Sequence, residues 1–377
     1  MTSGVAQATD ATTSAGAAQA ADTAKAVDPA KAADASLTRS ELTAPGIRRR
    51  RSGRGFRYFA ADGTPLADAV ALARIKALVI PPAWEDVWIC PREDGHIQAV
   101  GTDVAGRRQY RYHDRWRDQQ DREKFDRMLE FGRALPRVRT TSERHLRGRE
   151  LSRERVLAAA VRLIDLGFFR SGSDEYAADN GTFGLATIRR EHVTCHQDEI
   201  TFEYVGKSGK RHVQTVADDL ASPVVRRLKR RRSFPDCDDL LVFRSGSRWH
   251  NVTAGNINDY LRDISGGDFT AKDFRTWHAT VLAAVGLAVS EAAESPTARK
   301  RAITRVVHEV ADYLGNTPAV ARGSYIDPRI IARYEEGITI ASSLADLGKG
   351  REFGDVATKG HAEQALLKLL SSGPARV

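Results

Sequence analysis

The stretch LGNTPAVARGSYID, residues 314–327, places a tyrosine in a polar run directly after a helix stop. The helix should end at Gly315, and Tyr325 follows Asn316 by nine residues. A tyrosine hydroxyl can act as a nucleophile that forms a covalent intermediate. Most exposed tyrosines do no chemistry, however, so Tyr325 taken alone is better interpreted as an ordinary surface residue on a connector. Other parts of the chain have to decide between these two readings.

A possible nucleotide site is the tripeptide Gly206-Lys207-Ser208, which superficially suggests a phosphate-binding Walker loop. That motif requires a glycine at position 201, where the chain has Thr201, and a helix directly afterwards. A basic strand pattern follows instead, so we reject a nucleotide site. The segment EITFEYV-GKSG-KRHVQTV predicts a hairpin with Lys207 at its tip.

Metal binding is a second possibility, because His192, Cys195 and His196 lie close together in the sequence. A metal site needs further donors at suitable spacing, and no second Cys/His pair accompanies these residues. Strand alternation would also turn His192 and Cys195 to opposite faces. No Ser/His/Asp constellation stands out, and the acidic residues are too scattered to nominate a catalytic pair. We therefore expect neither a metal site nor a cofactor.

The charge of the chain indicates a polyanionic partner. Its 377 residues carry a formal net charge of +9, and the isoelectric point is near 9.6, as is common in proteins that bind nucleic acid. Basic blocks stand at residues 48–51 (RRRR) and 226–232 (RRLKRRR). A single charge run is usually a solvated face, but two of them in so basic a chain favour contact with DNA or RNA.

The segment QYRYH, residues 109–113, adds aromatic side chains to this basic pattern. In a strand, a period of two puts Tyr110 and Tyr112 on one face and Gln109 on the other. The two tyrosines could pack in the core of a β domain, or they could contact nucleic acid.

Nothing in the sequence points to a membrane or to export. No window is apolar over the roughly 18 residues that a spanning helix needs, and the N-terminus lacks a basic region followed by an apolar core. The three cysteines, Cys90, Cys195 and Cys237, lie far apart, which argues against a disulfide framework and fits a reducing compartment. We expect a cytoplasmic protein.

Composition divides the chain into four parts. Residues 1–42 are rich in small and polar residues and contain no aromatic residue, which predicts a disordered tail. Residues 43–119 carry strand and turn signals, which predict a small antiparallel β domain. Residues 120–371 are mainly helical in periodicity, and residues 372–377 form a flexible C-terminus. The fold class is therefore α+β, a β-rich N-terminal domain followed by a mainly α-helical domain with a small β-sheet.

Apolar periodicity and residues typical of helix ends predict the helices of the second domain. Ser152 should cap one helix that stops at Gly167, while Pro296 and Gly315 should bracket another. The predicted spans are 121–135, 152–167, 218–231, 254–264, 271–287, 296–314 and 362–370.

Five segments, taken together, resemble the type IB DNA topoisomerases, specifically the small poxvirus-like and bacterial members. In chain order they are VGTDVAGRRQYRYH, FFRSG with GTFGLATIRREHV, FEYVGKSGKRH, TAKDFRTWHATV and LGNTPAVARGSYID. Each segment is weak alone, but together they span about residues 45–335 in the expected order.

The resemblance implies that the chain relaxes supercoiled duplex DNA. Tyr325 would attack a phosphodiester, forming a 3′-phosphotyrosyl link while a 5′-hydroxyl leaves, without ATP or metal. A monomer would act as a clamp of two domains on nucleoid DNA. The other implied site residues act on the phosphate or the DNA: Arg170, Arg275 and Asn316 as phosphate donors, Lys207 as general acid, Lys272 in support, and Gln109, Tyr110 and Tyr112 as DNA contacts.

One position departs from the family pattern. The family often has histidine where this chain has Asn316. An asparagine amide can donate a hydrogen bond to a phosphate oxygen, but it cannot carry positive charge or transfer a proton.

Two other functions fit parts of the sequence. A tyrosine recombinase or integrase shares the same catalytic logic, but recombinases usually read H-x-x-R where this chain reads Lys272-Asp273-Phe274-Arg275. The β-rich N-terminal domain also favours a topoisomerase. A catalytically silent DNA-binding protein would explain the basic blocks but not the four phosphate-directed segments.

Overall fold

The computed structural model describes residues 36–172, 181–196, 199–206, 209–231, 238–290, 295–344 and 359–372. The chain divides into two compact units, Met1–Gln120 and Asp121–Val377. Most of the expected N-terminal tail, residues 1–35, lies outside the described residues, as do residues 373–377 at the expected C-terminal tail.

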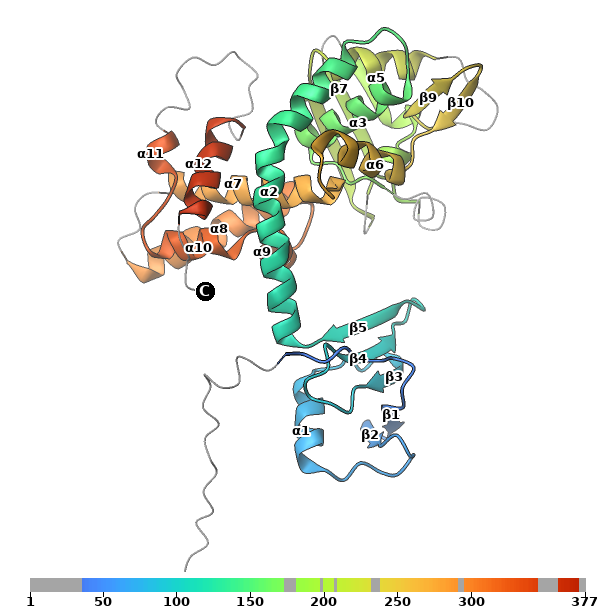
Figure 1. The fold of residues 1–377 in the computed structure, drawn as a ribbon, viewed down its shortest axis with the longest axis vertical. Helices are drawn as coiled ribbons and strands as arrows, with labels where there is room; N and C mark the ends of the chain where they lie inside the picture. Colours follow the sequence, from blue (N-terminus) through green and yellow to red (C-terminus); the bar gives the residue numbers. More distant parts are fainter. Residues whose placement is uncertain are drawn as a thin grey trace, which may run out of the picture. The chain divides into compact units, whose positions relative to one another are not determined.

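The first unit is built on a five-stranded antiparallel sheet (Figure 1). The strand order is β2-β1-β3-β4-β5, with β1 Ile47–Ser52, β2 Gly55–Phe59, β3 Glu85–Ile89, β4 Ile97–Thr102 and β5 Arg108–Tyr112. A helix that the sequence patterns did not predict, α1 Ala69–Ala77, buries Ile75 against core residues of the sheet such as Val87 and Ile89. Its N-terminus is capped by Asp68, whose side chain accepts from the Val70 amide.

Residues just before the predicted domain boundary also belong to this sheet domain. Thr38 bridges Gly95, and its amide donates to the Asp94 carbonyl at 2.9 Å. The Ser40 hydroxyl donates to the Ile97 carbonyl at 3.0 Å. Composition placed residues 36–42 in the tail because they contain few large side chains, whereas their backbone and hydroxyl groups supply the contacts.

The second unit is mainly helical (Figure 1). Its principal helices are α2 Asp114–Leu146, which begins within the first unit, α3 Arg153–Gly167, α5 Ala221–Arg230, α6 Ala254–Ser265, α7 Ala271–Val289, α8 Pro296–Leu314, α9 Pro318–Ser324, α10 Pro328–Glu335, α11 Ala341–Leu344 and α12 His361–Ser371. Helix α2 is much longer than predicted, because it continues through Pro136 to Leu146.

Two small sheets accompany these helices. One has the order β6-β7-β8, with β6 Val193–His196, β7 Glu199–Val205 and β8 Arg211–Ala217, and the predicted hairpin is its β7–β8 pair. The other is a hairpin of β9 Val242–Ser245 and β10 Arg248–Asn251. The segment LATIRREHV forms two short 3₁₀ turns, Leu185–Thr187 and Arg190–His192, before β6.

Helix α7 is the centre of the second unit, since it contacts α3, α6, α8, α10, α11 and α12. Trp277 on α7 is fully buried, and its ring faces Gly132 of α2. A Cβ atom at Gly132 would lie 2.4 Å from Trp277 Cη2, so a side chain there would prevent this close packing. Arg275 lies on the same helix, close to this well-packed core.

No helix in the described ranges combines the length and the apolar character that crossing a membrane requires.

Candidate active site

Arg275 joins the ends of two helices that are distant in sequence. Its guanidinium donates to the Phe168 carbonyl after α3 and to the Leu314 carbonyl at the end of α8, both at 2.7 Å. Only 5% of Arg275 is exposed. Its Nε has no partner among the described residues. The two carbonyls therefore fix the plane of a buried permanent cation.

The end of α3 adopts an unusual backbone to present its carbonyl. Ser152 caps the start of α3 as predicted, because its side chain accepts from the Arg155 amide. The helix then ends at Gly167, but the left-handed residue is Phe168, with φ of 57°. Such a conformation is costly for a residue with a Cβ atom, and it persists only where the surroundings impose it. Here the Phe168 carbonyl is held by Arg275.

Tyr325 lies at the C-terminal end of the short helix α9, so the polar run after Gly315 is helical rather than a plain connector. The Tyr325 amide donates to the Ala321 carbonyl at 3.1 Å, and the Thr280 hydroxyl of α7 donates to the Tyr325 carbonyl at 3.2 Å. The side chain is 9% exposed, and its ring centroid lies 5.5 Å from Arg275 Cζ. The tyrosine is therefore anchored beside the buried arginine.

The charges around Tyr325 favour its ionised form. Burial alone would raise the pKa of its hydroxyl, but the nearby cations Arg275 and Arg170 outweigh this effect, and the net pKa lies below the ordinary value. Lys272 contributes in the same direction. Burial, followed by repulsion from Arg170, lowers the pKa of Arg275 to about 10, so Arg275 stays charged at neutral pH.

Arg170 and Asn316 meet directly. The Arg170 guanidinium donates to Oδ1 of Asn316 at 2.9 Å. Because a guanidinium has only donors, the amide must turn its oxygen to Arg170. The Nδ2 atom is buried and has no partner in the part of the chain that the structure describes. Among the described residues, Asn316 therefore keeps one amide donor without a partner beside the Arg170 guanidinium.

A small cavity shows which other side chains share this region. Both predicted arginines, Arg170 and Arg275, line it, together with His212 and Gln214 of β8 and Tyr204 of β7. Sequence analysis did not single out His212. The predicted hairpin could have indicated it, because the β7–β8 register pairs His212 with Tyr204.

Of the two predicted lysines, Lys207 and Lys272, the structure describes only Lys272. Lys207 lies outside the described residues; the Gly206 amide before it donates to the Lys210 carbonyl at 2.7 Å. The strand β8 begins at Arg211, where a Walker loop would require a helix. Lys272 is exposed on α7, one turn before Arg275.

The predicted DNA-contacting residues of β5 belong to the first unit, whereas Arg170, Arg275 and Tyr325 belong to the second. Tyr110 and Tyr112 share a face, with stacked rings whose centroids are 6.0 Å apart. They are 40% and 36% exposed, so packing within the core is not their role. The Gln109 amide donates to Asp103 at 2.9 Å, which orders the turn before β5.

Several cations of the basic blocks are bonded within the protein. Lys229 donates to the Val193 carbonyl, and Arg231 donates to the Asp239 carbonyl. In the first block, Arg49 donates to the Trp84 carbonyl at 2.6 Å. These side chains help to hold neighbouring loops. The count of basic residues in the two blocks therefore overstates the positive charge available to a nucleic acid.

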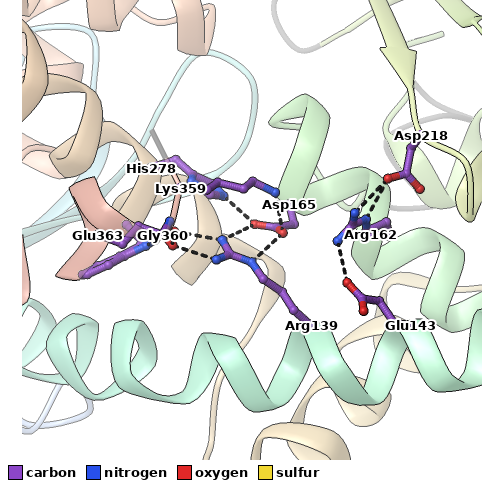
Figure 2. Close-up of polar contacts among 10 residues, drawn as sticks. Arg139, Glu143, Arg162, Asp165, Asp218, His278, Lys359, Gly360 and Glu363 are labelled. Atoms are coloured by element: carbon purple, nitrogen blue, oxygen red, sulfur yellow. Dashed lines mark hydrogen bonds and ion pairs between the residues drawn. The ribbon is translucent and has the colours of Figure 1, made fainter. Parts of the chain in front are cut away.

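Behind the site, a buried ionic network connects four elements (Figure 2). Asp165 of α3 accepts from Nε and Nη2 of Arg139, each at 3.0 Å, from Lys359 at 2.7 Å and from His278 Nε2 at 3.1 Å. Arg139 also bonds Glu363 of α12. Because His278 lies one turn after Arg275, the network fixes α7 and α3 close to the site. This placement fits a structural role for His278.

Within the described ranges, no group of three or more His, Cys, Asp or Glu side chains could hold a metal ion.

Comparisons with known proteins find similarity to DNA topoisomerases along most of the chain. Residues 113–345 match the family model described as eukaryotic DNA topoisomerase I, catalytic core, and residues 55–103 match the bacterial DNA topoisomerase IB, N-terminal domain. The chain is 30% identical over 289 residues to DNA topoisomerase 1B of Acanthamoeba polyphaga mimivirus, covering 74% of this chain and 85% of that protein. It is 22% identical over 264 residues to DNA topoisomerase 1B of Vaccinia virus, covering 69% and 75%.

Proposed function

The chain belongs to the type IB DNA topoisomerases, and from this premise we propose that it relaxes supercoiled duplex DNA with Tyr325 as its nucleophile. The convergence of Tyr325, Arg275 and Arg170 is the observation that carries the proposal. These residues come from three separate segments, and the two cations lower the pKa of the hydroxyl against the effect of burial.

The first chemical step forms a covalent enzyme–DNA intermediate. The Tyr325 oxygen attacks phosphorus and loses its proton to water, while the bond between phosphorus and the 5′-oxygen breaks. The product is a 3′-phosphotyrosyl link and a free 5′-hydroxyl. The broken strand then rotates about the intact one, and attack by the 5′-hydroxyl restores the phosphodiester and releases Tyr325. Because the link conserves the energy of the broken bond, ATP is not required. We propose that side chains of the site, rather than a metal ion, stabilise the charge that develops on phosphorus.

Negative charge on the phosphorane is offset by side chains of the site. Arg170 and Arg275 present planar forks that suit two phosphate oxygens, and the unused Nδ2 donor of Asn316 adds a third contact. Each donor aimed at developing charge contributes roughly 3–4 kcal/mol, or about 10²–10³ in rate.

The leaving 5′-oxygen needs a proton, because an alkoxide is far more basic than a tyrosinate. We assign this proton to Lys207 on the β7–β8 hairpin, acting as general acid. Lys272 supports the site as a further positive charge near Tyr325. Tyr110, Tyr112 and Gln109 of β5 would contact the duplex.

The tyrosine recombinase alternative has no support beyond the shared catalytic logic, since the matched families are topoisomerases. All site residues come from one chain, so we propose that a monomer closes around the duplex as a clamp.

Relaxation of a supercoiled plasmid in excess chelator and without ATP tests this function. Wild type should relax the plasmid, and Tyr325→Phe should bind DNA without relaxing it. A strict requirement for magnesium would overturn the metal-free mechanism, and relaxation by Tyr325→Phe would overturn the assignment of the nucleophile.

A further inference from the structure

We propose that His212 of β8 is an additional catalytic residue, which donates a hydrogen bond to a non-bridging oxygen of the scissile phosphate. This inference rests on the proposed chemistry at Tyr325 and extends the set of phosphate donors.

The position of His212 is the first argument. Its ring lines the same cavity as Arg170 and Arg275, which are the two proposed phosphate ligands. The Leu314 carbonyl that orients Arg275 belongs to the residue directly before Gly315, and His212 lies against that glycine. An anion held by the two arginines would therefore come close to the imidazole.

Two glycines, Gly206 and Gly315, leave the space that the His212 imidazole occupies. A Cβ atom at Gly206 would lie 2.4 Å from His212 Cδ2, and one at Gly315 would lie 2.9 Å from Cε1. Distances this short do not occur between real side-chain atoms and their neighbours, so a side chain at Gly206 would displace the ring. The Tyr204 ring stacks on the remaining face, with centroids 5.4 Å apart and planes inclined by 18°. Three neighbours thus fix the ring plane.

The ring nitrogens of His212 have no hydrogen-bond partner among the residues that the structure describes, although the ring itself makes a stacking contact. A structural histidine in this chain behaves differently, since His278 is fully buried and bonded to Asp165 at 3.1 Å. The free donor of His212 and its place beside two arginines indicate a ligand that arrives from outside.

Electrostatics explains how His212 could respond to that ligand. Burial, and then repulsion from Arg170 and Arg275, lowers the pKa of the imidazole, which favours its neutral form. A neutral imidazole still carries one N–H donor. A bound phosphate would screen the arginines and attract a proton, so the hydrogen bond should strengthen as negative charge develops on the phosphorane.

The test measures single-turnover cleavage of a short duplex by His212→Ala and His212→Asn. We expect His212→Ala to lose about 10- to 100-fold, within the range for one lost donor, and His212→Asn to recover part of the rate because its amide can donate. Folding and DNA affinity are checked by circular dichroism and by binding of the intact duplex.

A merely structural role is separated by replacing one non-bridging oxygen of the scissile phosphate with a methyl group. If His212 contacts that oxygen, the difference between wild type and His212→Ala should vanish for one methylphosphonate diastereomer and persist for the other. An equal defect with both diastereomers would overturn the proposal, as would wild-type cleavage by His212→Ala.

Gly206→Ala provides a second measurement, which does not depend on the His212 variants alone. The added methyl should displace the ring, so it should slow cleavage in wild type and add little in the His212→Ala background. Fully additive defects would contradict the proposal. Failure of the nucleophile assignment is distinguishable, because it would leave Tyr325→Phe active, whatever His212 does.

Discussion

Arg170 and Asn316 lie 146 positions apart in sequence, yet the guanidinium of one donates to the amide oxygen of the other at 2.9 Å. This hydrogen bond fixes the orientation of the arginine. The Nδ2 donor of Asn316 has no partner among the described residues. Where the family often has histidine, this chain therefore has a group that is fixed in orientation but cannot carry charge.

Substitutions of Asn316 should distinguish the effect of its oriented amide donor on cleavage from the effect of charge at this position. Asn316→Ala should slow single-turnover cleavage by about 10²–10³, the range for one lost donor. Asn316→Asp should be slower still, because a carboxylate would pair with Arg170 and repel the phosphate. Asn316→His is the matched control with a family-like donor. Equal rates for the Asp and Ala variants would contradict the proposed contact with phosphate.

Arg275→Lys should lose activity although it keeps the charge. A lysine has its donors on a single atom and cannot reach both the Phe168 and the Leu314 carbonyl as the guanidinium does. We expect a loss of about 10²–10³ in cleavage rate, with duplex binding nearly unchanged. The measurement is single-turnover cleavage beside equilibrium binding. A lysine variant that cleaves as fast as wild type would refute this role.

The titration of Tyr325 should reveal its cationic surroundings. Its pKa lies below the ordinary value, whereas burial raises the pKa of Tyr204 in the same cavity region to about 12. Tyr325 should therefore ionise first as pH rises, and Arg170→Ala should move its midpoint upward by removing a positive charge. NMR of ring-labelled tyrosine measures both midpoints, with Tyr325→Phe assigning the signal. A Tyr325 midpoint above that of Tyr204 would contradict the electrostatic account.

The buried network should make stability depend on pH. Burial would raise the pKa of Asp165, but His278, Lys359 and Arg139 hold it well below the ordinary value. A depressed carboxyl pKa stabilises the fold above the unfolded value, near 4, and this contribution is lost as pH falls toward the folded pKa. Asp165→Asn should lower the free energy of unfolding by about 3–5 kcal/mol at neutral pH. This difference in unfolding free energy between the variant and wild type should become smaller as the pH falls.

Urea unfolding between neutral and acidic pH measures this difference. Glu143→Gln is the control, because Glu143 forms a partly exposed ion pair of 3.6 Å with Arg162 (Figure 2), and pairs near the surface contribute about 1 kcal/mol or less. A difference between wild type and Asp165→Asn that stays constant with pH would show that Asp165 is not the titrating group.

Local signals predicted much of the fold. Helix α8 has the predicted bounds, since Pro296 at its first position, apolar residues along one face and Gly315 past its end all agree. Strand β5 follows its predicted period-two pattern, because burial alternates along Arg108–Tyr112. Helix α9 was missed because only seven residues separate Thr317 from Tyr325, too few for a periodic pattern.

Relationships across the chain could not be read locally. Nothing near Phe168 signals its left-handed conformation, and its carbonyl accepts a hydrogen bond from Arg275, more than a hundred positions away. The tyrosine and arginines were identified through the family resemblance rather than through spacing. His212 escaped notice because its importance comes from the glycines and arginines that surround it in space.

The most direct test of the central claim is to map the covalent adduct. A duplex with a nick that lets the 5′-terminated fragment diffuse away traps the intermediate, and trypsin should release residues 323–329, GSYIDPR, with DNA attached. Our account predicts a 3′-phosphate link on Tyr325, the one tyrosine of that peptide, and no adduct with Tyr325→Phe. DNA attached to a different peptide, or joined through a 5′-phosphate, would contradict it.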